Sequence, residues 1–436
     1  MTRRTELQPG VFLTAVQDRR FKTACFSLSF LRPLRVGEAA MNALLPSVLL
    51  RGSKKTPSIR AIADRLDDLH GASVGALVRK KGEVQLTGLF ADCLEDQYAG
   101  ETVFLQLLDF VSELLFCPQM ENSAFLPQLV QQERQNLQNA MQSVLDDKGA
   151  YCERQMLRSM CRGERYACGR LGEPEELDAI DARTLWTHYE SLLASSRVEL
   201  FYLGSQSADE IAVQLRPLLA QLPRAACVMA STVPGPQPQT LRRFSETMPL
   251  AQSRFSMGFR TDVTLQSAQY PAMLLLNAML GGGEQNRLYT VVRGQLALCY
   301  EAGSWYDGHK GILAASAGCG RADLTAVEQE ILRQLAELAE GRFSQAELEV
   351  ARAGLLSDLR LLCDSPGRLD EFYTGRAAAG VFEMDAGRSH DSAGKGACGG
   401  FVEYRPRQSL RILGRRGVSG HGSAGFRYYS DAGCRK

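Results

Sequence analysis

Few residues in this sequence have the types and spacing that metal or nucleophile chemistry requires. The histidines of the first 380 residues are His70, His188 and His309, and none has a second histidine or a cysteine three or four positions away. Twelve cysteines occur without a C-x-x-C pair, and the two nearest in sequence are Cys161 and Cys168. Zinc sites and cysteine nucleophiles need closer partners of these kinds. The pattern favours surface or helix-end histidines and buried, reduced thiols, although a single cysteine nucleophile stays open.

Two further clusters have simple structural explanations. Gly281, Gly282 and Gly283 form a glycine run, but the G-K-[ST] ending of a phosphate-binding loop does not follow. A tight turn is therefore favoured over nucleotide binding. The basic run Arg79–Lys81 is interpreted as the exposed decoration of a hairpin turn.

The stretch NALLPSVLLRGSKKT, residues 42–56, is unusual. Its apolar run is interrupted at Pro46-Ser47 and ends at an Arg-Gly turn that is followed by two lysines after the serine. The run is too short to cross a membrane. A proline inside it also argues against an ordinary long helix.

Composition limits the class of protein. The 436 residues should form two or more domains, and 45% hydrophobic and 23% charged residues are typical of globular proteins. A net charge of +1 argues against a general attraction to nucleic acid or anionic membranes. The first residues, MTRRTELQPGVFLTAV, lack the apolar region of a signal peptide. We therefore expect a cytoplasmic protein with no membrane segment.

The elements that would position these residues follow a repeated order. Ser58 is a candidate N-cap for a helix that ends near Gly71, and Ser344 opens a capping box. Strands are expected at 11–16, 25–30, 73–78, 83–90 and 197–204, and helices at 93–115, 125–145, 185–193, 207–222, 324–338 and 344–362.

The chain is predicted to be an α+β protein with two homologous lobes, each an antiparallel-rich sheet packed with helices. The second half repeats the first, because NAML at 277–280 opens a helix-to-glycine turn as NALL does at 42–45. Residues 232–240, TVPGPQPQT, hold three prolines and read as an extended linker. The expected boundaries are a first lobe at 1–228, a Pro-rich linker at 229–243, a second lobe at 244–380 and an aberrant tail at 381–436.

This order of elements resembles the insulinase-like zinc metallopeptidases, whose signature is the inverted zinc motif H-x-x-E-H. RGSKK at 51–55 is similar to the turn that follows the zinc helix of the family. GRLGEPEELDAI at 169–180 is similar to the loop and helix that precede its lobe-closing strand. LGGGEQNRLYTVVRGQLALCY at 280–300 is the most specific match. The resemblance covers roughly residues 10–380.

The residues of the zinc motif are missing from this chain. With Gly52 as the anchor, the two histidines and the glutamate of the motif fall on Ala43, Ser47 and Pro46, and the third ligand of the family falls on Ala140. Alanine and proline offer no donor atom, and a serine hydroxyl is a poor zinc ligand. Without the metal and the general base, the resemblance implies a protein that does not hydrolyse peptides.

The resemblance implies a silent subunit that works with a zinc-bearing homologue as a heterodimer. No metal or cofactor is expected in this chain, and peptide or protein is the expected substrate. Arg293 and Tyr300, with Gly281, Gly282 and Gly283, match residues that face substrate in active relatives, and packing remains the alternative for Arg293 and Tyr300. A particular resemblance is to motif-less bacterial members associated with the modification of elongation factor P. Rival hypotheses are an active peptidase with an atypical site, a non-catalytic scaffold and the product of a damaged gene.

The tail after Gly380 has a different character. Glycine, serine and arginine dominate it, and helical periodicity vanishes. One interpretation is a disordered basic tail. Another comes from codon degeneracy, because a one-nucleotide shift over residues 382–405 permits LRWTPDDLMTALEKVRAEDLSNIA, a typical helical sequence. A frameshift near Gly380 would remove the last helix and strand of the second lobe and leave an unpaired sheet edge.

Overall fold

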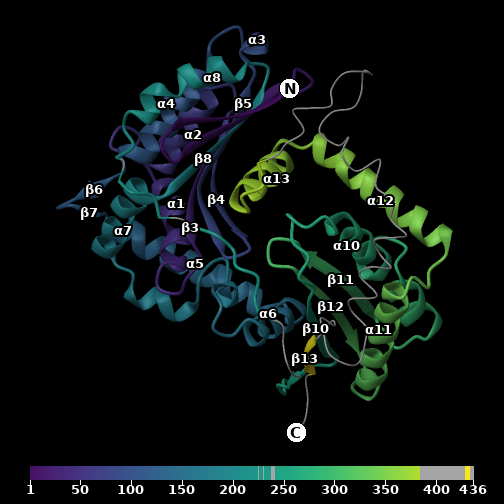
Figure 1. The fold of residues 1–436 in the computed structure, drawn as a ribbon. Coiled ribbons are helices and arrows are strands. Elements are labelled where there is room, and N and C mark those ends of the chain that lie inside the picture. Colours follow the sequence, from purple (N-terminus) through teal and green to yellow (C-terminus); the bar gives the residue numbers. More distant parts are fainter. Residues whose placement is uncertain (224, 229, 237–240, 383–427, 433–436) are drawn as a thin grey trace. The chain divides into compact units, whose positions relative to one another are not determined.

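The computed structural model describes residues 1–223, 225–228, 230–236, 241–382 and 428–432, which form two compact units. The first unit contains residues 1–142 and 168–231 and the segment that begins at Ser365. The second contains residues 143–167 and 232–364 and the strand at 428–432. Each unit has one antiparallel-rich sheet with helices packed on it, so the predicted α+β class is confirmed (Figure 1).

The sheet of the first unit has the order β1-β2-β8-β3-β5-β4. Neighbours are antiparallel except β2 and β8, which run parallel. The strands are β1 (Thr2–Gln8), β2 (Val11–Gln17), β3 (Thr23–Pro33), β4 (Ser73–Lys81), β5 (Val84–Leu94) and β8 (Arg197–Gly204), with β6 (Met120–Glu121) and β7 (Ala124–Phe125) as a separate hairpin.

Helices cover both faces of this sheet. Tyr202 of β8 packs edge-on against Phe104 of α4, whereas the adjacent Phe201 stacks on Tyr373 of α13. Successive strand residues point to opposite faces, so α4 and α13 lie on opposite sides of the sheet. The helices of this unit are α1 (Ala39–Leu49), α2 (Ile59–Asp68), α3 (Asp96–Ala99), α4 (Val103–Phe116), α5 (Pro127–Asp146, whose last turn is grouped with the second unit), η2 (Pro174–Ala179), α7 (Ala182–Ser195), α8 (Ala208–Gln214), α9 (Arg216–Leu219) and α13 (Pro366–Ala378).

The second sheet, β11-β12-β10-β13-β9, repeats this topology. β13 runs parallel to β9 and antiparallel to β10, as β8 does to β2 and β3. The strands are β9 (Arg242–Phe244), β10 (Ser253–Arg260), β11 (Glu301–Asp307), β12 (Ile312–Cys319) and β13 (Tyr428–Ala432). The helices are α6 (Lys148–Met160), η1 (Arg165–Ala167), α10 (Tyr270–Asn277), the π-helices η3 (Ala278–Gly282) and η4 (Leu288–Gln295), η5 (Arg321–Asp323), α11 (Leu324–Ala339) and α12 (Gln345–Cys363).

Helix α6 covers one face of the second sheet. Met156 and Met160 of α6 pack with Ile312 and Ala314 of β12, while Leu313 points into the core shared with α10 and α11. A helix from the first half of the sequence therefore belongs to the second unit, and α13 from the second half belongs to the first.

Two predicted helices differ from the structure. The segment 93–115 is not one helix, because Cys93 still pairs with Ala24 in the sheet and Gly100 ends α3 with a φ of +79°. The helix expected over 207–222 is divided at Leu215 into α8 and α9, because Pro217 in the first turn of α9 has no N–H for a continuous helix.

The caps were predicted correctly. Ser58 Oγ accepts from the amide of Ala61 at 3.1 Å, and Ser344 and Glu347 form the expected capping box.

Helix α1 runs through Pro46, which corrects the expectation that the proline would interrupt it. Proline lacks the N–H that would bond the carbonyl of Asn42 four residues earlier. Thr87 of β5 supplies the missing donor, because its hydroxyl donates to that carbonyl at 2.5 Å. A strand side chain thus satisfies the backbone group that Pro46 leaves open.

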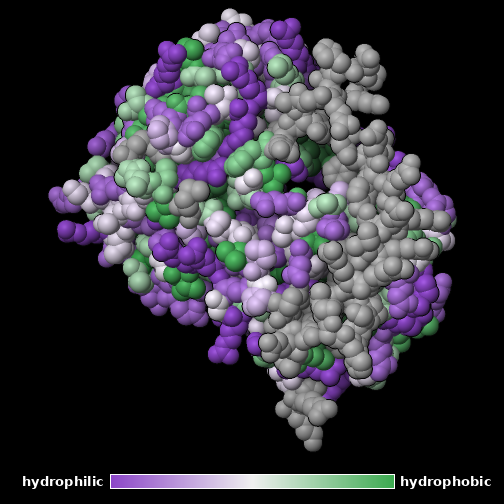
Figure 2. All heavy atoms as spheres, in the orientation of Figure 1, coloured by the Kyte–Doolittle hydropathy of each residue, from purple (hydrophilic) through white to green (hydrophobic). Residues whose placement is uncertain are grey.

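Among the described residues, no helix is both long and apolar enough to cross a membrane. On the face shown in Figure 2, hydrophilic residues cover much of the surface and hydrophobic residues gather in separate small patches. The described cysteines are all free thiols, and burial raises the pKa of Cys25 and of Cys93, the latter to about 12.

Most of the predicted aberrant tail, residues 383–427 and 433–436, lies outside the described residues. The exception is β13, which occupies the position between β9 and β10. β10 therefore has a partner at the place where a shifted frame was expected to leave an unpaired edge.

Candidate functional site

A cavity of about 300 Å³ in the first unit brings together the residues at the predicted zinc positions. Ala43 and Ser47 line it from α1, and Ala140 lines it from α5. Ala43 and Ser47 are four residues apart and so share one helix face. Pro46 is buried on the same helix but does not line the cavity. The other lining residues are Leu44, Ala76, Val78, Glu133, Asn136, Leu137, Arg170 and Leu171.

Three polar side chains at this cavity, those of Glu133, Asn136 and Arg170, already have protein partners. Glu133 forms an ion pair with Arg51 of the RGSKK turn, and Asn136 Nδ2 donates to Glu133 Oε1 at 3.2 Å. Arg170 donates to the carbonyl of Val78 at 3.1 Å. The described residues contain no group of three His, Cys, Asp or Glu side chains that could hold a metal. The cavity does not fit a catalytic zinc, which needs about three protein ligands.

The RGSKK turn connects the end of α1 to α4 and α5. Gly52 has a φ of +141°, and a Cβ there would lie 2.8 Å from the backbone of Pro57, so the position requires glycine. Ser53 Oγ accepts from the amide of Thr56 at 2.8 Å and donates to Glu113 of α4. The turn therefore keeps a structural function without the zinc chemistry.

A buried polar network holds α1 from the opposite side. Asn42 Oδ1 accepts from His188 Nε2 at 2.7 Å, and Asn42 Nδ2 donates to Gln85 Oε1 at 2.9 Å. Gln85 Nε2 in turn donates to the carbonyls of Ala39 and Arg170. Burial lowers the pKa of His188 to about 4, so its imidazole is neutral at pH 7. Sequence reasoning missed this network, although Asn42 inside an apolar run was a signal.

The segment 169–180 anchors the start of α1. Glu176 Oε2 accepts from the amides of Gly37 at 2.9 Å and Ala40 at 3.3 Å. A negatively charged carboxylate near the N-terminus of α1 is also stabilised by the partial positive charge of the helix dipole at that end. Gly172 has a φ of +82°, and a Cβ there would lie 2.5 Å from the amide nitrogen of Ala40. This explains the glycine of the GRLG motif by close packing.

The other two histidines contact acids at separate places. His70 Nε2 lies 2.7 Å from Glu101 Oε1 at an exposed position of the first unit. His309 of the second unit interacts with Asp307. The three histidines do not form a common site.

The basic run Arg79–Lys81 is more than surface decoration, which corrects its interpretation. Arg79 pairs at 2.6 Å with Asp370 of α13, whose side chain is fully buried, and Ser27 donates to the same carboxylate at 2.6 Å. Lys81 pairs with Glu371 at 2.5 Å. These contacts attach α13 to the sheet of the first unit.

The glycine run of the second unit is packed tightly. A Cβ on Gly281 would lie 2.5 Å from the amide nitrogen of Ser304 on β11, and one on Gly283 would lie 2.8 Å from the carbonyl of Ala278. A Cβ on Gly282 would lie 2.3 Å from Asn277 Nδ2. Close approach between η3 and its surroundings is sufficient reason for glycine at these positions.

Arg293 and Tyr300 are both exposed in the second unit. The Arg293 guanidinium lies over the ring of Tyr289, 4.9 Å from its centroid. Tyr300 is 63% exposed, and its amide donates to the carbonyl of Gly318 at 2.8 Å. Within the described residues, no hydrogen bond or ring contact joins Arg293 to Tyr300. The side chain of Tyr300 is therefore available for an external contact.

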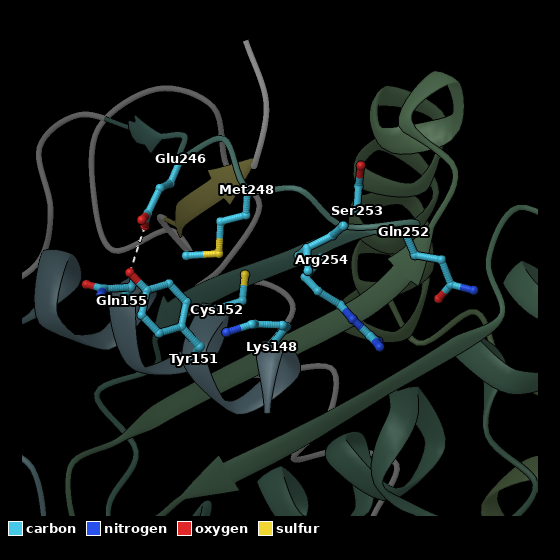
Figure 3. A pocket seen from close by; sticks show the side chains of 10 residues that line it. Lys148, Tyr151, Cys152, Gln155, Glu246, Met248, Gln252, Ser253 and Arg254 are labelled. Atoms are coloured by element: carbon cyan, nitrogen blue, oxygen red, sulfur yellow. Dashed lines mark hydrogen bonds between the residues drawn. The ribbon is translucent and has the colours of Figure 1, made fainter. Parts of the chain in front are cut away.

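A second cavity, of about 70 Å³, lies between α6 and the segment that precedes β10 (Figure 3). Tyr151 of α6 donates to Glu246 Oε2 at 2.8 Å, and Cys152 and Met248 also line the cavity. A space of this size holds only a few water molecules. The cavity in the first unit is therefore the better candidate site.

Comparison with known proteins agrees with this geometry. Residues 179–355 match the family model described as the Peptidase M16 inactive domain. The probable inactive metalloprotease YmfF of Bacillus subtilis strain 168 is 28% identical over 374 residues, which cover 85% of this chain and 88% of that protein.

Two crystal structures share the fold over the whole chain. A conserved protein from Enterococcus faecalis V583 has a TM-score of 0.85 and 22% identity, with 100% of this chain and 99% of that chain covered. The M16 inactive domain from Pseudomonas fluorescens has a TM-score of 0.75 and 14% identity, with 100% and 98% covered. With no set of zinc ligands at the cavity where the zinc motif was expected, the chain is similar to inactive members of the insulinase-like, or M16, metallopeptidases.

Proposed function

We propose that this chain is the substrate-holding, non-catalytic subunit of a heterodimer with a zinc-bearing homologue. The observation that carries the proposal is the cavity between α1 and α5, which keeps its framework but has no set of zinc ligands. The framework is held by the RGSKK turn, by Glu176 and by the buried network around Asn42. A site preserved in shape but without ligands suits binding rather than hydrolysis.

The neighbouring sheet edge supports a role in holding peptide. β4 is the last strand of its sheet, and in the described residues no strand pairs with its outer edge. Ala76 and Val78 of this strand line the cavity. An unpaired edge offers backbone donors and acceptors to an extended peptide. The cavity and the edge together form one continuous candidate surface.

The proposal is tested by co-expression with an H-x-x-E-H homologue from the same genome. Light scattering after gel filtration should detect a 1:1 complex, and the pair should hydrolyse casein at least about tenfold faster than the homologue alone. Stoichiometric zinc with turnover by this chain alone would support the atypical-peptidase alternative instead. A complex whose activity equals that of the homologue would support a scaffold.

Arg293 and Tyr300 should contribute substrate contacts in that complex. Because both side chains are exposed, Arg293→Ala and Tyr300→Ala should leave thermal stability unchanged and raise the KM of the pair about tenfold, as expected when a contact worth about 1.4 kcal/mol is removed. Leu361→Ala, at an exposed position of α12, is the matched control. Unchanged kinetics in both variants would assign the two residues to packing or to another surface.

A narrower function in the modification of elongation factor P rests on the family resemblance. Intact-mass measurement of elongation factor P from strains with and without this gene tests it. Loss of the modified mass in the deletion strain is the expected result, and an unchanged mass would remove the link.

A further inference from the structure

We propose that the cavity lined by α1 and α5 binds a monocarboxylic acid, with the carboxylate on the guanidinium of Arg170 and an apolar body inside the cavity. The inference goes beyond the proposed function, because binding of such an acid requires neither a partner subunit nor a protein substrate.

The charge at the cavity carries the first step. Two of the lining side chains, Glu133 and Arg170, carry charge. Glu133 is paired with Arg51. In the part of the chain that the structure describes, the guanidinium of Arg170 donates only to the carbonyl of Val78, which is a neutral group. Two guanidinium groups and one carboxylate leave one positive charge without a counter-charge, and an anionic ligand would supply it.

The donors that remain on Arg170 carry the second step. An arginine side chain has five N–H donors in one plane, and its pairs with carboxylates are frequently bidentate. The bond to Val78 uses one of these donors, on Nη1. The backbone of Arg170 is itself held, because Gln85 Nε2 donates to its carbonyl at 2.8 Å. The guanidinium therefore starts from an anchored backbone and keeps N–H groups for a carboxylate.

Ser47 of α1 adds a neutral donor at the same cavity. Its hydroxyl has no hydrogen-bond partner among the described residues. Asn136 Nδ2 also has a second N–H beside the one that it donates to Glu133. A carboxylate accepts several hydrogen bonds, so donors from α1 and α5 can complement those of Arg170.

The apolar lining and the volume define the rest of the ligand. The largest apolar side chains at the cavity are Leu44, Leu137 and Leu171. A cavity of about 150 Å³ already accepts a benzene molecule. The volume of about 300 Å³ is therefore sufficient for a benzene ring or a short alkyl chain that carries a carboxylate.

The same features disfavour other classes of ligand. A cation would place a second positive charge beside Arg170. A second carboxylate on the ligand would lie among apolar side chains and lose its hydration without a partner. A neutral amide has the right shape but makes weaker hydrogen bonds to a guanidinium than a carboxylate does.

Isothermal titration calorimetry of the full chain with benzoate, benzamide and benzylamine tests the inference. The three compounds have nearly the same shape and differ in charge. Benzoate should bind with a dissociation constant at least about tenfold lower than that of benzamide, because its hydrogen bonds to Arg170 are charge-assisted. Benzylamine should give no saturable heat. Equal affinity for benzoate and benzamide, or no saturable binding of benzoate, would overturn the site.

Three variants locate the binding site. Arg170→Gln keeps an N–H for the carbonyl of Val78 but removes the charge, so it should weaken benzoate at least about tenfold and benzamide less than about twofold. Ala140→Phe, at an exposed lining position, should fill the cavity and prevent binding of both compounds. Arg60→Gln, at an exposed position of α2 that does not line the cavity, is the matched control and should bind benzoate as the parent does. Benzoate binding that survives Arg170→Gln or Ala140→Phe contradicts the proposal.

A carboxylate of this kind has two natural sources, a free organic acid and the C-terminus of a peptide. Competition against benzoate with a tetrapeptide that ends in Phe, as the free acid and as the amide, distinguishes them. Displacement by the free acid alone would identify a peptide terminus, and displacement by neither would identify a small acid. Displacement by both would overturn the carboxylate requirement.

The heterodimer measurements separate this inference from the proposed function. An active complex that does not bind benzoate removes only the acid site. Benzoate binding by a chain that forms no complex removes only the subunit function.

Discussion

At the scale of single residues, the first unit has no set of zinc ligands at its cavity, but buried hydrogen bonds hold the helix that lines it. Ala43, Ser47 and Ala140 offer no set of metal ligands, yet they face one cavity as ligands would. Asn42, next to Ala43, is held by two buried hydrogen bonds. The side-chain types at these positions explain why the cavity has no set of zinc ligands.

Restoring the side chains should restore zinc binding. The combined change Ala43→His, Ser47→His and Ala140→Glu supplies three ligands at the cavity, and Pro46→Glu adds the glutamate of the motif on the same helix. We expect about one zinc per chain by plasma mass spectrometry and none in the parent chain. The same protein without Ala140→Glu is the control and should bind more weakly. No zinc in the full variant would mean that α1 and α5 do not converge as described.

His188 should make the stability of the first unit depend on pH. Its pKa is about 4 in the fold, against 6.5 for an unperturbed imidazole, so the unfolded chain binds the proton more tightly. The contribution to stability is complete above about pH 6.5 and is lost as the pH falls towards 4, with about 2 kcal/mol lost by pH 5. Urea unfolding at pH 7 and pH 5 measures it, with Trp186 as the fluorophore in a Trp305→Phe background.

His188→Gln is the comparison for this experiment, because glutamine can still donate to Asn42 but does not titrate. The variant should lose less stability than the parent between the two pH values. An equal loss in both proteins would place the pH dependence in other groups.

At the scale of elements, Thr87 of β5 compensates for Pro46 of α1, because the threonine hydroxyl donates to the carbonyl that the proline cannot bond. Thr87→Val would leave the buried carbonyl of Asn42 without a donor and should destabilise the first unit by about 1–3 kcal/mol. In a Pro46→Ala background the helix supplies its own N–H, so the same change should cost much less. Chemical denaturation of the four proteins in the cycle measures the coupling. Equal costs in both backgrounds would show that the threonine hydroxyl does not replace the missing helix bond.

The sequence correctly predicted the features that depend on interactions between residues close together in the chain. Ser58 and Ser344 cap helices because a hydroxyl and an amide three residues away are enough. The helix predicted over 93–115 failed for the opposite reason. Cys93 has a strand partner in Ala24, almost 70 positions earlier, and this pairing overrides the local helical pattern.

The candidate site was predictable only in part. The motif positions Ala43, Ser47 and Ala140 were brought together correctly by the resemblance, because family motifs encode tertiary contacts. The supporting contacts were not predicted. Gln85 and Thr87 alternate as polar residues inside an apolar strand, which was a signal for buried hydrogen bonds, but their partners lie on α1 and in the 169–172 segment.

At the scale of the whole molecule, the buried pair of Arg79 and Asp370 connects β4 to α13, two elements of the first unit that are far apart in the sequence. Arg79→Ala would leave the fully buried carboxylate of Asp370 without its cation and should destabilise the first unit by about 3–5 kcal/mol. Lys81→Ala, which loses an ion pair with the half-exposed Glu371, should cost less than about 1 kcal/mol. Unfolding followed by Trp186 fluorescence measures both changes.

The double variant Arg79→Ala, Asp370→Ala is the control for this pair. It should be more stable than Arg79→Ala alone, because no uncompensated charge remains. If Arg79→Ala and Lys81→Ala have equal effects, α13 is attached to the sheet by apolar packing alone.

Helix α6 belongs to the second unit and α13 to the first, and the late position of α13 in the sequence has a consequence during protein synthesis. The strands of the first sheet are complete once β8 has been made, but α13, which covers Leu31, Leu77 and Leu86 on one face, is translated much later. At about 5–20 residues per second, that face waits on the ribosome for roughly ten to thirty seconds. During this interval the nascent chain exposes an apolar sheet face and is a natural client for ribosome-associated chaperones.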